Sequence, residues 1–149
     1  MFGTRRNLLT TFMLLACGCL FLSQAQAADP IELKVSVIHA SKTGEKVDPA
    51  LKKIEKSLKK AFGGFSSFEQ VAKQADKLVV GKKLDIKLPN GQNAVVTYKG
   101  KAKKHHQLRL TIPKSKVAVD LSVPSRKMFY QAGIKHKAGI LVLAFYLKD

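Results

Sequence analysis

One segment near the end of the chain, Ile140 to Leu147, sets the strictest limit on the fold. Its sequence, ILVLAFYL, is apolar at every position apart from the hydroxyl group of Tyr146. Successive side chains of a strand point to opposite faces of a sheet, so this segment would be apolar on both faces. A strand of that kind belongs in the middle of a sheet rather than at its edge. We therefore predict a central strand at Ile140 to Leu147.

Several other stretches alternate apolar and polar residues, which predicts strands with one buried face. The first is IELKVSVIHA, from Ile31 to Ala40. In KKLDIKLPNGQNAVVTYKG, residues 82–100, a Pro-Asn-Gly turn separates two alternating runs, as is typical of a β-hairpin. HQLRLTI, residues 106–112, and KVAVDLSV, residues 116–123, continue the series of strands.

The clearest helix signal is VDPALKKIEKSLKKAFGG, from Val47 to Gly64. Asp48 can cap the free amides, Pro49 suits the first turn, and Gly63 can end the helix. Apolar residues recur at helical spacing, and the opposite side carries Lys52, Lys53, Lys56, Lys59 and Lys60. We expect the apolar stripe to pack on the sheet and the lysines to face solvent. The alternative is that this helix lies on the surface of an anionic membrane.

The segment from Ser66 to Val80 stays open between helix and strand. Its apolar residues have helical spacing, but it runs into the strand-like KLVVG, residues 77–81. The predicted fold class is α+β: an antiparallel-rich sheet of about six to seven strands with one amphipathic helix packed on it.

Residues 1–27 have the features of an export signal. Arg5 and Arg6 precede an apolar run, and Ala-Gln-Ala at residues 25–27 offers small residues for cleavage. A membrane anchor and lipidation at Cys17 are weaker alternatives, and the export route, general secretory or twin-arginine, stays open. We expect residues 28–149 to form one exported, most simply periplasmic, domain. Both cysteines, Cys17 and Cys19, lie in the signal, so this domain would have no thiol chemistry or disulfide.

Positive charge is the most unusual property of this domain. Residues 28–149 hold 25 Lys and Arg against 10 Asp and Glu, a net charge of +15. Such a field attracts polyanions, although lysines also keep an exposed surface soluble. Candidate partners outside the cytoplasm are anionic envelope polymers and lipid head groups, or an acidic envelope protein.

Two predicted hairpin tips are especially basic. One lies within YKGKAKKHHQLRL and offers Lys101, Lys103 and Lys104, with Arg109 on the return strand. The other, within YQAGIKHKAGIL, has Gly133 and Gly139 as turn residues around Lys135, His136 and Lys137. Whether the two tips share one edge of the molecule is not fixed by the sequence.

Catalytic and metal-binding patterns are weak in this chain. His105 and His106 are neighbours on a predicted strand, so they point apart and cannot easily share a metal ion. A site would require His39, His136 or a carboxylate to converge on one of them, so we expect two partly exposed histidines beside a basic tip. No Gly-x-Ser-x-Gly elbow or phosphate-binding glycine loop is present. We therefore expect a protein without catalytic activity, cofactor or bound metal, and we infer no small-molecule substrate.

The order of these elements resembles a group of small exported bacterial proteins. The resemblance rests on VSVIHASKTGEKVDPALKKIEKSLKKAF, LDIKLPNG, LRLTIP and GIKHKAGILVLAF. In that group a first strand leads to an Asp-Pro-started helix, a β-meander, and a Gly-x-Lys-His-x-x-Gly turn before the last strand. The resemblance implies a fold and an exported location, with Ser66 to Val80 extended, and it implies no activity.

Two functions follow as hypotheses. The first is binding of a polyanion or the envelope surface through the lysine helix and the basic tips. The alternative is a protein–protein module that joins a larger envelope assembly through an exposed strand edge. Binding to a polyanion should weaken steeply with salt, whereas strand pairing should not. The sequence leaves the oligomeric state open.

We predict export with cleavage after Ala27, because the charged start, the apolar run and the small residues occur in the required order. Cell fractionation and the intact mass of the purified protein test this prediction. A cytoplasmic product that still begins at Met1 would contradict it.

Overall fold

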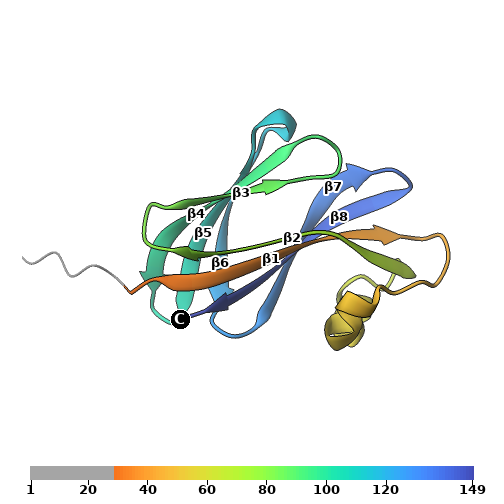
Figure 1. Ribbon diagram of the computed structural model, residues 1–149, viewed down its shortest axis with the longest axis horizontal. Coiled ribbons are helices and arrows are strands. Elements are labelled where there is room, and N and C mark those ends of the chain that lie inside the picture. Colours follow the sequence, from red (N-terminus) through yellow and green to blue (C-terminus); the bar gives the residue numbers. More distant parts are fainter. Residues whose placement is uncertain (1–28) are drawn as a thin grey trace, which may run out of the picture.

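The computed structural model describes residues 29–149, so the predicted export signal and both cysteines lie outside the described residues. Eight strands form two four-stranded sheets, and a short helical segment lies against one of them (Figure 1). The α+β class is confirmed. There are somewhat more strands than predicted, and they are divided between two sheets.

Sheet A has the strand order β2-β1-β8-β7, and sheet B has the order β3-β4-β5-β6. Every neighbouring pair is antiparallel. The elements are β1 Ile31–Ser41, the 3-10 helix η1 Pro49–Ile54, α1 Glu55–Ala61, β2 Ser67–Leu78, β3 Lys83–Lys87, β4 Asn93–Ala102, β5 His105–Ile112, the 3-10 helix η2 Pro113–Ser115, β6 Val117–Pro124, β7 Met128–His136 and β8 Gly139–Lys148.

The inner faces of the two sheets pack against each other and form the main core. Val35 of β1 and Phe145 of β8 contribute from sheet A, and Val96 of β4 and Leu110 of β5 contribute from sheet B. All four side chains are at most 1% exposed. The two sheets therefore form a sandwich around one apolar interior.

Strand β8 is buried on both faces, as its sequence predicts. It lies between β1 and β7 in sheet A. Leu143 and Phe145 face the main core, while Val142 and Ala144 belong to a second apolar cluster on the outer face of the sheet. The prediction of a central strand at Ile140 to Leu147 is confirmed.

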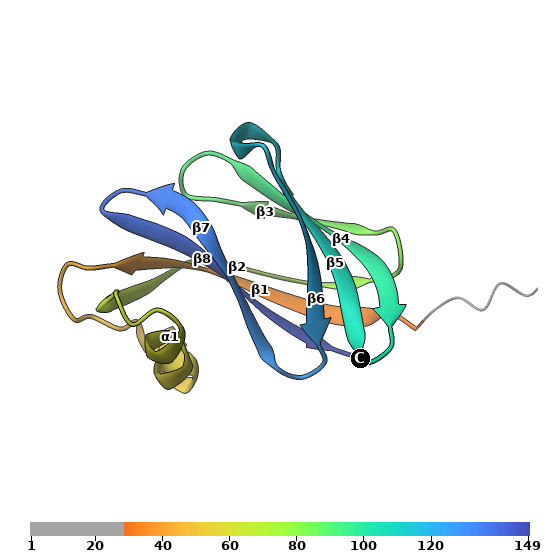
Figure 2. The same ribbon diagram turned by 180° about the vertical axis from the view of Figure 1, so that it is seen from behind.

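The second cluster lies between sheet A and the helical segment, which begins where the sequence predicts. The Asp48 carboxylate accepts a hydrogen bond of 2.9 Å from the backbone N–H of Ala50. Leu51 and Leu58 are buried against Ile38 and Phe68. The first turns are 3-10 helix, and α-helix begins at Glu55. Figure 2 shows α1 against one end of sheet A, so the rest of the outer face is not covered by the helix.

Ser66 to Val80, left open by the sequence, is almost entirely strand β2. It pairs with β1 over its whole length, with a bulge: Val37 opposes Ala72, but Ile38 opposes Gln70. The extra residue shifts the alternation, so Phe68 faces the helix and Ala72 faces the main core. The bulge therefore places two apolar residues that are four positions apart on opposite faces of the sheet, which interrupts the alternation expected of a strand.

The predicted turn between Gly133 and Gly139 is shorter than the sequence suggested. Lys135 and His136 still belong to β7, and the turn itself is Lys137 and Ala138. Gly133 forms a bulge within β7, with a φ of 126°. Gly139 is required for close packing, because an added Cβ would lie 1.9 Å from the carbonyl oxygen of Ala40.

We predict that Gly139→Ala lowers the free energy of unfolding by at least about 2 kcal/mol, because β1 and β8 would have to move apart. Urea denaturation followed by circular dichroism is the measurement. Gly64→Ala is the control, since an added Cβ there meets no atom within 4 Å. Equal stability of the two variants would contradict the close packing of β1 against Gly139.

Candidate anion-binding face

The part of sheet A that the helix leaves bare carries four exposed lysines. Leu33, Val35 and Val37 point inward, so the residues between them point outward. Strand pairing then places three rows of side chains on the outer face: Lys77, Glu32 and Lys148; Ala75, Lys34 and Tyr146; and Lys73, Ser36 and Ala144. Neighbours within a row lie about 5 Å apart at their Cβ atoms.

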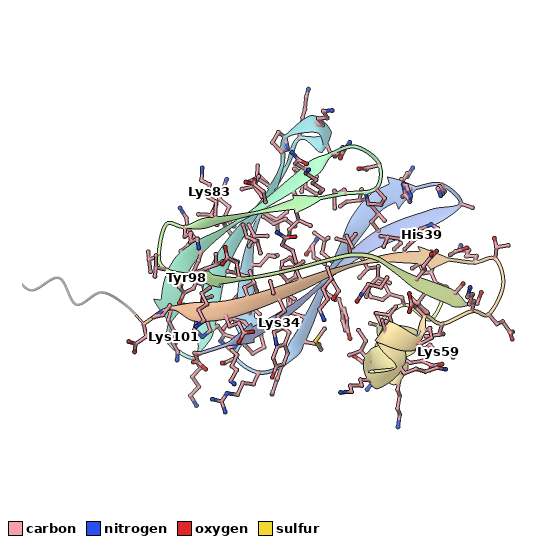
Figure 3. All side chains as sticks on the ribbon, in the orientation of Figure 1. Lys34, His39, Lys59, Lys83, Tyr98 and Lys101 are labelled. Atoms are coloured by element: carbon pink, nitrogen blue, oxygen red, sulfur yellow. The ribbon has the colours of Figure 1, made fainter. Side chains whose placement is uncertain are left out.

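The helical segment adds the five lysines that the sequence singled out. Lys52, Lys53, Lys56, Lys59 and Lys60 are all exposed, as predicted. Figure 3 shows Lys34 of β1 and Lys59 of α1 on the same side of the molecule. We define the basic face by these five residues together with the four strand lysines, Lys34, Lys73, Lys77 and Lys148.

Among the described residues, two carboxylates form ion pairs with lysines of the basic face. Glu55 lies 2.8 Å from Lys59 and 3.3 Å from Lys52, and Glu32 lies 3.2 Å from Lys34. Hydrogen bonds from Lys59 and then from Lys52 hold the pKa of Glu55 below its ordinary value. Two carboxylates against nine lysines leave a large positive excess on the basic face.

The two basic hairpin tips do not form one patch. Lys135 and Lys137 lie beside the start of β8, whereas Lys101 forms an ion pair of 3.1 Å with Asp149, just beyond the end of β8. Ten residues of strand, or about 30 Å, separate the two places. Lys103 and Lys104 form the exposed turn between β4 and β5, as predicted.

Arg109 is separate from both tips and from the basic face. It lies on the outer face of sheet B, where its guanidinium group contacts the Asp120 carboxylate at 3.0 Å. The predicted site residues therefore fall into four places, and the basic face holds the largest group of them.

His106 is buried, which corrects the expectation of two partly exposed histidines. His105 and His106 do point to opposite faces: His105 is exposed, while His106 is 1% exposed. One ring nitrogen of His106 lies 2.9 Å from the Tyr98 hydroxyl, and the other lies 3.4 Å from the Asp149 carboxylate. With both nitrogens engaged, His106 joins the end of β8 to sheet B.

Asp149 is the centre of this contact, and no local sequence pattern pointed to it. Its carboxylate accepts hydrogen bonds from the Ser125 hydroxyl and the Lys101 ammonium group as well as contacting His106. Hydrogen bonds from Ser125 and then Lys101 hold the pKa of Asp149 well below its ordinary value. Three parts of the chain that are distant in sequence, namely the β4–β5 hairpin, Ser125 and Asp149, thus meet at one carboxylate.

The other two histidines meet at the opposite end of β8. The rings of His39 and His136 lie edge to face, 5.2 Å apart, and His39 Nε2 lies 3.3 Å from the His136 carbonyl oxygen. Desolvation, then His39 and Lys137, lower the pKa of His136. Within residues 29–149 no three His, Cys, Asp or Glu side chains form a group that could hold a metal ion.

Comparisons of the chain with protein-family models, with curated proteins and with solved structures find no match. In the described part of the chain, no helix has the length and apolar character needed to span a membrane.

Sequence reasoning missed Lys34, Lys73, Lys77 and Lys148 as members of a site. The alternation in Ile31 to Ala40 already placed Lys34 opposite the buried side chains. Lys73 and Lys77 required the strand assignment of β2, and Lys148 required the pairing of β8 with β1.

We predict that Asp149 makes the protein less stable in acid. A carboxyl group whose pKa is lowered by folding stabilises the native state above its unfolded pKa and loses that effect as the pH falls. The loss should begin near pH 4 and continue below it. Thermal unfolding at several pH values should show a smaller acid destabilisation for Asp149→Asn than for the wild type.

The control for this prediction is Asp120→Asn, because Asp120 is an exposed carboxylate with one arginine partner. That variant should keep the acid response of the wild type. An identical acid response of Asp149→Asn and the wild type would contradict the role given to Asp149.

Proposed function

We propose that this chain is a non-enzymatic, exported protein of the cell envelope and that its basic face binds anionic polymers or anionic lipid head groups. The observation that carries the proposal is the gathering of nine exposed lysines, three of them ion-paired with Glu32 or Glu55, on the outer side of sheet A.

The arrangement of the lysines suits a ligand recognised by its charge density. Lysine ammonium groups are mobile point charges, and they do not impose the fixed fork geometry of arginine. Lysines in all three rows of sheet A and on the helical segment allow several anionic groups to be contacted at once. Each contact releases condensed counterions from a polyanion, which favours binding at low salt.

The basic face supports this function better than the hairpin tips do. Each tip offers a few cations, and Lys101 is held by Asp149. In the helical segment, by contrast, Lys53, Lys56 and Lys60 have no carboxylate partner within residues 29–149. These three side chains are also exposed, so they can contact a ligand without any change in the core.

We predict that replacing Lys53, Lys56 and Lys60 by Glu weakens binding to heparin and to lipopolysaccharide. The slope of log affinity against log salt should flatten by about one unit for each lost contact. Thermal stability should change little, because the three residues are exposed. The measurement is a binding titration of variant and wild type at several salt concentrations.

A matched variant separates the basic face from net charge alone. Replacing Lys103, Lys114 and Lys116 by Glu makes the same change in charge at exposed positions outside the basic face. It should retain most of the wild-type affinity and salt slope. Equal losses in the two variants would mean that overall charge, and not the basic face, binds the polyanion.

A further inference from the structure

The edge of β2 that faces away from β1 is already paired with the protein's own backbone at the N-terminal end of the strand. β2 pairs with β1 on one side, and Val47 forms a short parallel bridge to Phe68 on the other. The N–H of Phe68 donates to the Lys46 carbonyl and the N–H of Asp48 donates to the Phe68 carbonyl, both at 2.9 Å. An added strand therefore cannot pair with this end of β2.

Side chains close the other end of the same edge. The N–H of Lys77 donates to the Asp76 carboxylate at 2.8 Å, and the Lys77 carbonyl accepts a hydrogen bond of 3.0 Å from the Lys82 ammonium group. Both main-chain polar groups of Lys77 thus have partners within the chain.

Between these closed ends lies an open stretch, Lys73 to Ala75. Lys73 lies on the outer face, because its cross-strand partner Ser36 lies there. Ala75 is two residues further along β2 and therefore lies on the same face. Phe68, which also faces outward, directs its N–H and carbonyl to the free edge. Residues on one face of an antiparallel strand direct these groups to the same side. Lys73 and Ala75 therefore present two N–H and two carbonyl groups at the edge, and no hydrogen bond from elsewhere in residues 29–149 reaches them.

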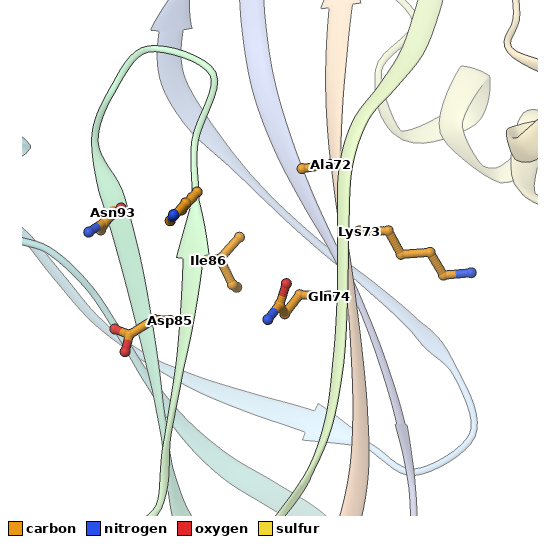
Figure 4. Close-up of a pocket in the computed structure, with 7 residues that line it drawn as sticks. Ala72, Lys73, Gln74, Asp85, Ile86 and Asn93 are labelled. Carbon is orange, nitrogen blue, oxygen red and sulfur yellow. The ribbon is translucent and has the colours of Figure 1, made fainter.

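A groove of about 600 Å³ runs beside this open stretch. It lies between β2 and β3, and β3 is itself an edge strand, paired with β4. In Figure 4, Ala72 and Gln74 of β2 and Ile86 of β3 lie between the two strands, whereas Lys73 points away. The groove can take small side chains from an added strand.

We propose that Lys73 to Ala75 binds an extended segment of another protein, which adds to sheet A as a strand beside β2. Alternate residues of that segment would be acidic and would face Lys73 and Lys77 on the outer side. The residues between them would be small and apolar and would enter the groove beside Ile86. This is strand addition to an exposed sheet edge, with specificity from alternating side chains.

Charge identifies the occupant as an acidic partner and not a second copy of this chain. Two copies paired antiparallel through Lys73 to Ala75 would bring Lys73 of each copy diagonally beside Lys73 and Lys77 of the other, on one face of the sheet. Like charges at this range repel, and edge lysines commonly prevent such self-association. Acidic side chains at the same positions would instead form cross-strand ion pairs.

The proposal can be tested separately from polyanion binding, because strand addition also requires main-chain hydrogen bonds and alternation of side chains. The probe is a fluorescent peptide of about ten residues with alternating Glu and Val. Its control has the same composition with the Glu and Val residues in two separate blocks. Both peptides carry the same charge, and the blocked peptide lacks the alternation that an added strand requires.

The test variant is Ala75→Pro, which removes a free N–H at the edge and leaves the hydrogen bonds of β2 to β1 in place. Its control is Ala118→Pro, another exposed alanine on an edge strand, β6. Fluorescence anisotropy should show at least about tenfold weaker binding of the alternating peptide by Ala75→Pro, and unchanged binding by Ala118→Pro. The blocked peptide should bind the wild type at least about tenfold more weakly than the alternating one.

Amide hydrogen exchange of the wild-type protein gives a second measurement that requires no variant. The alternating peptide should slow the exchange of the Lys73 and Ala75 amides. Unchanged exchange at both amides, or equal binding of the two peptides, would overturn the proposal. Any binding of the peptide would then be due to charge attraction only. A dimer of the wild type in sedimentation that Ala75→Pro abolishes would assign the edge to a second copy and would also overturn it.

Discussion

The arrangement of the whole domain depends on the burial of sheet A from both sides. The inner face is covered by sheet B along its length, while the outer face is covered by a helical segment of little more than a dozen residues. The sequences of β1 and β8 reflect this difference in how far each face is covered. Under the helix their outward residues are apolar, such as Ile38 and Val142, and beyond it they become Lys34 and Lys148. The short helix thus determines where an exposed face exists, and the strands supply its charge.

The two ends of β8 are held by different kinds of contact. At its start, Gly139 allows β1 to approach so closely that no side chain would fit. Just beyond its end, Asp149 accepts hydrogen bonds from the Ser125 and Lys101 side chains and contacts the buried ring of His106. The polar cluster is held together by charge-assisted hydrogen bonds, which respond to pH, whereas the glycine contact is steric and does not. Stability at the two ends should therefore depend on different conditions.

Local patterns in the sequence predicted those features that depend on neighbouring residues. Spacing within a few residues predicted that strand β8 is buried on both faces. It also predicted the start of the helical segment at Asp48 and the outward lysines of the helix. The bulge in β2 interrupts the alternation of apolar and polar residues, so periodicity did not identify this segment as a strand. The number of sheets, the distance between the hairpin tips and the contact of Asp149 with His106 depend on strand pairing between distant segments. No local pattern carries that information.

The basic face and the open edge of β2 share Lys73 and Lys77, so the two proposed binding events are not independent. A bound acidic strand would neutralise two of the four strand lysines and would place further carboxylates beside the rows of the basic face. It would therefore lower the attraction of this face for a polyanion, and by linkage a bound polyanion would weaken the added strand to the same degree. Lys53, Lys56 and Lys60 lie on the helical segment, away from the edge, and would keep their charge in both states. The helix lysines would then hold the protein on an anionic surface, while the strand lysines would exchange one anionic ligand for the other.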